Sequence, residues 1–407
     1  MTDRFLAFRH SAFARYWGGR FAMSFAVQII SVSVAWQIYD LTRNPYHLGL
    51  IGLVQFLPSL VLVLVTGTAS DRYGRRLIMG LSITVEAVCA VILLALTIFG
   101  KFGPVPVLSV LTVFGIARAF LGPAQASLVV NLVPAEVFPN AVSWNSSAWQ
   151  LASITGPVVG SLLYGISPEV AYSSGTLLLI ISAILVFSIP KPPARAATTE
   201  KRSFQMMLSG FKYIWSHKII LGAISLDLFA VLLGGAVALL PVYARDILQV
   251  NELGLGLLRS APGIGAIATA FWLSGHPIRD HAGIIMFIFV AIWGALTVVF
   301  GISTVPWLSI VVLALMGAAD MISVYIRETL LQLWTPDEVR GRVNAVNMVF
   351  LGASNELGEF RAGGMAGLIG TVPAVVIGGI GAVGVAALWS VLFPELRKAR
   401  HLTNKQD

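Results

Sequence analysis

GTASDRYGRR, residues 67–76, is a short charged stretch that separates two long apolar runs, 46–66 and 77–99. About twenty consecutive apolar residues cross the hydrocarbon core of a bilayer as a helix. The two runs therefore predict a pair of membrane-spanning helices joined by a tight loop. Gly67 and Gly74 suit such a short loop, because glycine adopts turn conformations that other residues avoid.

The rest of the chain has the composition of a membrane protein. Of its 407 residues 57% are hydrophobic and 11% are charged, whereas soluble domains carry about 25% charged residues. This deficit excludes an ordinary soluble protein. The net charge of +8 does not indicate a nucleic-acid partner, because the basic residues fall in short loops between apolar runs. Cys89 is the single cysteine of the sequence, which excludes a disulfide framework and a cysteine metal site.

Twelve apolar runs of spanning length follow one another along the chain, bounded by charges, glycine or proline. They are 16–39, 46–66, 77–99, 105–130, 140–164, 170–189, 219–243, 253–273, 283–302, 306–332, 341–367 and 371–393. The fifth and eleventh are the least apolar, as expected for helices that face a bundle interior rather than lipid. The predicted fold class is an all-α membrane protein of twelve helices in two pseudo-symmetric six-helix bundles.

The basic residues orient these helices. With both termini in the cytoplasm, nineteen of the 27 lysines and arginines lie in cytoplasmic segments, and only Arg43, Lys101 and Arg245 lie in outer loops. Cytoplasmic loops of membrane proteins carry such an excess of Lys and Arg. The pattern predicts a multi-pass protein of a bacterial-type inner membrane, with cytoplasmic termini.

A linker divides the chain into equal halves. The stretch 190–218 is the longest polar one, and it opens with three prolines that cannot continue a helix. Its part from Phe204 to Trp215 is amphipathic and basic, which suits a membrane surface. The predicted domains are an N-terminal bundle, 1–189, the linker, 190–218, and a C-terminal bundle, 219–407.

The two halves share a sequence repeat at an offset of 202 residues. Matching segments are 115–118 with 317–320, 134–137 with 336–339, and Asn145 with Asn347. Such internal repeats are typical of transporters. The repeat places Arg118 and Asp320, which have opposite charges, at equivalent mid-helix positions.

Three motifs resemble those of the major facilitator superfamily. Residues 67–76 are similar to its loop signature G-x-x-x-D-R-x-G-R-[RK], Arg118-x-x-x-Gly122 to its buried-arginine motif, and 156–161 to the glycine-proline motif of antiporters, with Ser161 in place of a glycine. The resemblance covers essentially the whole chain. Runs at 239–244 and 336–342 look most like the enterobactin-exporter-like branch of efflux permeases.

The resemblance implies roles for these motif residues. The loop is expected to lock the outward-facing state, and Arg118 to take part in proton coupling. The expected conformational-gating residues are Gly67, Asp71, Arg72, Gly74, Arg75, Arg76, Gly156, Pro157 and Gly160. Asp71 can cap a neighbouring helix, and the arginines can bridge to acidic groups or to helix C-termini. A monomer is the habit of the family.

Acidic residues within the spans are candidate proton-binding groups. Glu356 and Glu359 lie three residues apart and share a helix face, where two carboxylates in a low dielectric repel and favour holding a proton. Alternatively, one of them pairs with an arginine such as Arg361, although that side chain projects from a different face. Asp320 is either the partner of an interior arginine or a second proton site.

Other charges in the spans are ambiguous. Asp227 and Arg20 lie at similar depths in the seventh and first spans. Either they are repeat equivalents that form an ion pair between the halves, or they are separate structural charges. Arg327 and Glu328 near the end of the tenth span are expected to be solvated. Glu86 is a lone acid in the third span, with no sequence context that ranks it.

Polar and aromatic groups on the first, fifth and eleventh spans are the candidate substrate-cavity residues. They are Arg20, Gln28, Gln37, Trp144, Asn145, Asn347 and Asn355. Most tryptophans are explained as interfacial belt residues. Trp144 stands out because it precedes the glycine-proline motif on a polar helix.

The sequence contains no catalytic constellation, no phosphate-binding loop and no histidine spacing for a metal. We therefore expect neither an enzyme nor a cofactor or metal site. The predicted function is proton-driven efflux of a small amphipathic compound, such as a drug or a siderophore. The partners are this substrate, protons and membrane lipid. Alternatives are a nutrient uniporter or symporter, a lipid flippase, or a transporter-like receptor.

Overall fold

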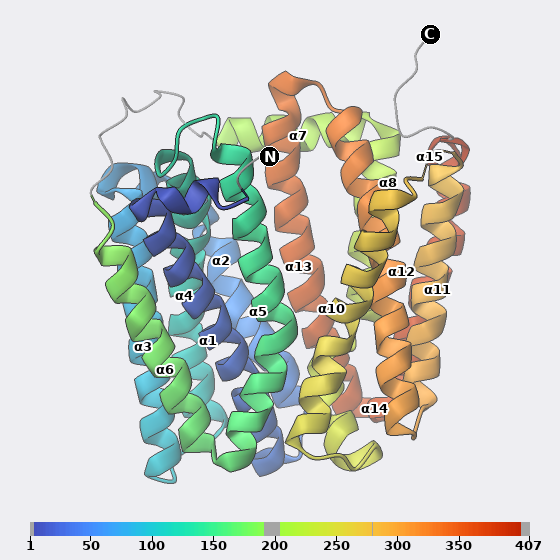
Figure 1. The fold of residues 1–407 in the computed structure, drawn as a ribbon. Helices are drawn as coiled ribbons and strands as arrows, with labels where there is room; N and C mark the ends of the chain where they lie inside the picture. Colours follow the sequence, from blue (N-terminus) through green and yellow to red (C-terminus); the bar gives the residue numbers. More distant parts are fainter. Residues whose placement is uncertain (1–3, 191–203, 279, 400–407) are drawn as a thin grey trace. The chain divides into compact units, whose positions relative to one another are not determined.

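The computed structural model describes residues 4–190, 204–278 and 280–399 (Figure 1). Their regular structure is helical throughout, which confirms the predicted all-α class. The long helices are α1 Ser11–Thr42, α2 Pro45–Tyr73, α3 Arg75–Ile98, α4 Pro104–Leu128, α5 Phe138–Ile166, α6 Pro168–Phe187, α8 Lys218–Gly234, α10 Glu252–Gly275, α11 Ala282–Ile302, α12 Pro306–Leu333, α13 Asp337–Ile369 and α14 Thr371–Leu392. The short ones are η1 Leu6–Arg9, η2 Val129–Asn131, α7 Phe204–Ser216, η3 Val237–Leu239, α9 Leu240–Val242, η4 Tyr243–Ile247 and α15 Pro394–Lys398.

Ten stretches of the described residues are long and apolar enough to cross a membrane. The two long helices outside this set are α5 and α13, which correspond to the two runs that the sequence marks as most polar. Their 29 and 33 residues give lengths of about 43 and 50 Å at 1.5 Å per residue, more than a bilayer core requires. Among the described residues, these two helices and the ten apolar stretches account for the twelve predicted runs.

The connection between α2 and α3 is shorter than predicted. Helix α2 continues through Tyr73, and α3 begins at Arg75, so that Gly74 alone makes the turn. Its φ of 91° lies in a region that residues with a Cβ avoid. Gly74 thus makes the tight turn that the sequence predicts, whereas residues 67–73 of the predicted loop belong to α2.

The seventh span is interrupted, although the sequence predicts one continuous helix over 219–243. Helix α8 ends at Gly234, and η3, α9 and the π-helical η4 complete the span. Two adjacent glycines and Pro241 weaken the helix here. Helix α13 also approaches closely, since a Cβ atom at Gly358 would lie 2.8 Å from the Val231 carbonyl oxygen.

The chain forms two compact units. Unit 1 comprises 1–43, 54–201 and 251–256, and unit 2 comprises 44–53, 202–250 and 257–407. Within unit 1, α1 packs against α5 and α6, and α3 packs against α4 and α6. Within unit 2, α8 packs against α13 and α14, and α11 packs against α12 and α14. The same four pairings occur in each unit, as the sequence repeat implies.

Helix α7 belongs to unit 2, where Figure 1 shows it lying across the ends of the long helices. It packs on α13, since Arg342 donates to Ser209 Oγ at 3.1 Å. Tyr213 donates to the Trp334 carbonyl oxygen at 3.4 Å, and burial raises the pKa of this tyrosine. Phe211 and Trp215 remain exposed. The predicted amphipathic segment is thus a helix with one packed and one exposed side.

Candidate functional site

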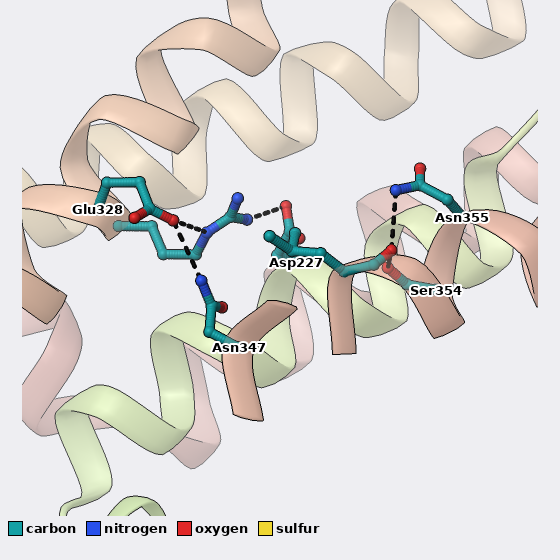
Figure 2. A network of polar contacts seen from close by, with 7 residues as sticks. Asp227, Glu328, Asn347, Ser354 and Asn355 are labelled. Carbon is teal, nitrogen blue, oxygen red and sulfur yellow. Dashed lines mark hydrogen bonds and ion pairs between the residues drawn. The ribbon is translucent and has the colours of Figure 1, made fainter. Parts of the chain in front are cut away.

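A polar network around the buried Arg327 joins three helices of unit 2 (Figure 2). Asp227 of α8 forms an ion pair with Arg327 of α12, whose Nε lies 3.8 Å from Glu328 Oε1. Asn347 of α13 donates to the same Glu328 oxygen at 3.2 Å. We call these four residues the unit 2 node.

The prediction that Arg327 is solvated is wrong. Only 3% of its side chain is exposed, because Asp227 from another helix supplies a partner within the bundle. Asp320, two turns earlier on α12, is close enough for its charge to interact with Asp227 and Arg327. Three carboxyl groups thus share one guanidinium group.

Unit 1 contains a corresponding cluster on α1, α4 and α5. Tyr16 donates to the Gln125 carbonyl oxygen at 3.1 Å, and Arg20 lies 3.5 Å from the Tyr16 hydroxyl. With the amide oxygen of Gln125 turned toward Arg20, Nε and one terminal nitrogen of the guanidinium each donate to it at 2.9 Å. Asn145 lies beside Tyr16. We call these four residues the unit 1 node.

The repeat relates the two nodes. The offset of 202 carries Gln125 onto Arg327 and Asn145 onto Asn347. Arg20 and Asp227 occupy the first long helix of their units, which supports their interpretation as repeat equivalents. Each has its contacts within its own unit. The unit 1 node is therefore cationic, whereas the unit 2 node has an excess of acid.

A second acidic cluster in unit 2 contains Glu356 and Glu359 of α13. A Cβ atom at Gly52 of α2 would lie 2.9 Å from one carboxylate and 3.3 Å from the other, so both acids reach the same point. Arg259 of α10 interacts electrostatically with both. Arg361 instead donates to Met365 Sδ of its own helix at 3.2 Å. The sequence left open whether these acids bind a proton or pair with an arginine. Arg259 is an arginine that interacts with both of them.

Sequence reasoning did not predict site roles for Arg259 and Arg327, nor for the node residues Glu328, Tyr16 and Gln125. Both arginines were visible as charges in apolar runs, which is itself a signal of function or pairing. Their acidic partners come from other helices, and sequence spacing does not show which helices pack together.

Arg118 of α4 is exposed, unlike the buried arginine that its motif implies. It donates to Gln55 Oε1 of α2 at 3.4 Å. Helices α2 and α4 approach closely one turn earlier, where a Cβ atom at Gly115 would lie 2.7 Å from Gln55 Cα. Arg118 therefore sits beside a tight helix contact in unit 1.

The other cavity candidates make contacts inside their bundles. Gln37 is 8% exposed and accepts a hydrogen bond from Tyr172 at 2.8 Å. Trp144 donates to the Arg4 carbonyl oxygen at 2.9 Å and stacks on Phe5. Gln28 is half-buried, and the exposed Asn355 donates to the carbonyl oxygen of Leu351 on its own helix (Figure 2). Gln37 and Trp144 are thus held by their own bundle.

The arginines of the loop motif tie helix ends together. Arg75 donates to the Ser127 carbonyl oxygen at 2.8 Å, and Arg76 donates to that of Ile189. These carbonyls lie at the C-terminal ends of α4 and α6, where cations are favoured. Arg72 is exposed and lies over the ring of Tyr73. Gly67 and Asp71 belong to α2, but their side-chain surroundings lie outside the described residues.

The glycine-proline motif brings α5 close to α1. A Cβ atom at Gly156 would lie 2.6 Å from Gln28 Cβ, and one at Gly160 would lie 2.9 Å from Ile29 Cα. Pro157 lies within the helix between them. Small residues at such contacts let helix backbones approach in a membrane.

Known proteins resemble this chain over nearly its whole length. Residues 2–405 match the family described as transmembrane secretion effector. The enterobactin exporter EntS of Citrobacter koseri is 25% identical over 412 residues, covering 96% of this chain and 94% of the relative. EntS of Escherichia coli O1:K1 is 24% identical over 409 residues with the same coverage.

Solved transporter structures share the fold. A bacterial homologue of the human lysosomal transporter Spinster, inward-facing and unoccupied, has a TM-score of 0.74 at 12% identity, with 96% of each chain covered. A D-xylose–proton symporter has a TM-score of 0.71 at 15% identity, covering 95% of this chain and 98% of its own. The chain belongs to the transmembrane secretion effector family and is a multi-pass membrane transporter of the major facilitator superfamily, not an enzyme.

Proposed function

We propose that this transporter exports a small amphipathic compound, a siderophore or a drug-like molecule, in exchange for protons. The name of its relatives, enterobactin exporter, supports the direction and the substrate class. The observation that carries proton coupling is the cluster of Glu356, Glu359 and Arg259.

The charge balance of this cluster suits a proton carrier. Arg259 interacts electrostatically with both carboxylates, so the two acids share one guanidinium. A charge within a bilayer costs about 2.5–3.5 kcal/mol on insertion scales. A proton on either acid lowers the number of charges in the cluster by one. Movement of Arg259 toward the protonated acid would favour release of the proton.

Glu359 and Arg259 lie away from the ends of their helices. Glu359 is ten residues from the end of α13 at Ile369, and Arg259 is seven residues from the start of α10 at Glu252. At 1.5 Å per residue these are about 15 and 10 Å from the helix ends. A proton would therefore have to pass along the helix bundle to reach these acids.

In the proposed cycle, the bundles 1–189 and 219–407 rock against each other in an inner membrane, with both termini in the cytoplasm. The linker 190–218, through α7, rests on the membrane surface. The two nodes supply charged and amide groups for the substrate, and the chain acts as a monomer. Such alternating access is typical of transporters built from repeats.

The test uses the purified protein in liposomes with an imposed pH gradient and an internal pH dye. A panel of siderophores and lipophilic cations is added to wild type, Glu356→Gln and Glu359→Gln. Glu395→Gln is the control, because Glu395 is an exposed acid of unit 2 whose partner, Lys218, is also exposed. We expect proton flux that depends on substrate, lost in either cluster variant and retained in the control.

Other outcomes separate the alternatives. Substrate-linked flux retained in both cluster variants would move the proton site to Asp227 or Asp320 of the unit 2 node. Substrate uptake without proton flux would favour a facilitator. Scrambling of labelled lipid without uptake of any compound would favour a flippase.

A further inference from the structure

Glu86 is a fully buried acid in unit 1 to which the mechanism above gives no role. It lies near the middle of α3, eleven residues from its start and twelve from its end. Its exposed fraction is 0%, and neither carboxylate oxygen has a hydrogen-bond partner in the part of the chain that the structure describes. Buried polar groups are nearly always hydrogen-bonded, so this carboxyl group requires an explanation.

In the described part of the chain, Arg118 is the cation that interacts with Glu86. Helix α3 packs against α4 and α6. From α4, Arg118 interacts electrostatically with Glu86. From α6, the stretch 173–187 contains no titratable residue, and on α3 itself Cys89 is the neighbouring titratable group. Burial is thus the main influence on the charge state of Glu86, and the charge of Arg118 opposes it.

Arg118 has two possible partners. Its present hydrogen bond to Gln55 Oε1 is 3.4 Å long, at the weak end of the range for such bonds. An ionised, unpaired carboxylate in this apolar environment would be strongly unfavourable, whereas a protonated one would not. While Arg118 binds Gln55, the site thus accommodates a protonated Glu86. If Arg118 turned toward the carboxylate, the ion pair would stabilise the ionised form.

We propose that Glu86 is a second proton-binding group of the transport cycle, which exchanges its proton as Arg118 moves between Gln55 and the Glu86 carboxylate. On release the carboxyl O–H bond breaks, and the proton passes to water beside the exposed Arg118. The inference rests on the proposed proton-coupled function and extends it to unit 1. Proton binding in one unit and acid clusters in the other would let both units respond to the pH gradient.

The first test reads the protonation of Glu86 directly. Infrared spectra of the liposome-embedded protein are recorded across a pH titration for wild type, Glu86→Gln and Glu136→Gln, the last being an exposed acid of the same unit. At neutral pH we expect the carbonyl band of protonated carboxylic acids to lose intensity in Glu86→Gln and not in Glu136→Gln, because the Glu356–Glu359 cluster contributes equally in all three proteins. The same band intensity in all three proteins would overturn the proposal.

The second test separates this inference from the proposed function. In the pH-gradient assay with siderophores and lipophilic cations, we expect Glu86→Gln to lose the pH dependence of substrate-linked proton flux, and Glu86→Asp to retain it with a shifted midpoint. Wild-type flux with an unchanged pH profile in Glu86→Gln would overturn the role of Glu86 alone. No substrate-linked flux in wild type would overturn the proposed function itself. If Glu86→Gln does not fold, the Glu86→Asp midpoint decides, and an unshifted one counts against the proposal.

Discussion

At the residue scale, the ionisable side chains within the spans are held in groups that extend across helices. Arg327 has Asp227, Glu328 and Asp320 around it, and Arg259 has Glu356 and Glu359. Removing one partner of a buried pair leaves the other charge without compensation, which costs more than the pair contributes. These groups are therefore sensitive to single substitutions and tolerant of matched double ones.

We expect Asp227→Asn to destabilise the protein by about 3–5 kcal/mol, because it strips Arg327 of its closest carboxylate. The double variant Asp227→Asn/Arg327→Gln should recover much of this loss. Thermal unfolding of the two single variants and the double variant in detergent measures the interaction energy between Asp227 and Arg327. Additive effects, with no recovery in the double, would show that the pair makes no net contribution.

How much of the site the sequence predicts depends on whether its residues share a helix. Glu356 and Glu359 were placed on one face by their spacing alone, and both do reach Gly52. Their cation, Arg259, comes from α10, and no spacing rule connects it to α13. The same holds for Asp227 and Arg327, which lie a hundred residues apart in the chain.

At the element scale, the length of each apolar run determines where a helix spans, whereas glycine and proline determine how it bends and packs. In the part of the chain that the structure describes, the predicted runs are helical, because spanning length and hydropathy are local properties. The interruption after Gly234 was missed because hydropathy does not register a backbone break in an apolar run. Its signals, the glycine pair and Pro241, were present in the sequence.

Glycines at helix contacts should be intolerant of even one methyl group. In Gly160→Ala the new Cβ would lie 2.9 Å from Ile29 Cα of α1, so the helices must separate. We expect a loss of about 1–3 kcal/mol from this overpacking. Gly122→Ala is the matched control, since nothing lies within 4 Å of its Cβ position. Thermal unfolding of the two variants tests this, and equal stabilities would refute a packing role for Gly160.

The single-residue turn between α2 and α3 should depend on glycine. Gly74→Ala forces a side chain into φ near 91°, at a cost of about 1–3 kcal/mol. Gly103→Ala offers a comparison at the start of α4, where the backbone is extended and the Cβ position is open. The midpoint temperature of thermal unfolding should fall for Gly74→Ala and remain unchanged for Gly103→Ala. A Gly74→Ala protein as stable as wild type would mean that the turn relaxes.

At the scale of the whole molecule, the two repeats share the same helix packing but carry different charges. The four helix pairings of unit 1 recur in unit 2, and Gln125 and Asn145 recur as Arg327 and Asn347. Packing follows the shared hydrophobic pattern, which is why the repeat could be found in the sequence. Charge differs because single substitutions change it without affecting helix packing. The halves are thus equivalent scaffolds with different electrostatics.

This difference predicts that coupling can be removed without removing transport. Arg259→Gln leaves Glu356 and Glu359 without their shared cation, and their repulsion should then keep a proton bound throughout the cycle. A permanently protonated cluster cannot exchange protons, although the helices can still move. We therefore expect Arg259→Gln to catalyse exchange of labelled substrate at equal pH, but to lose accumulation driven by a pH gradient. Arg361→Gln, which removes a guanidinium bound to Met365, should retain both activities. Loss of exchange as well in Arg259→Gln would assign Arg259 to the substrate path or to folding, and retained accumulation would exclude the cluster from coupling.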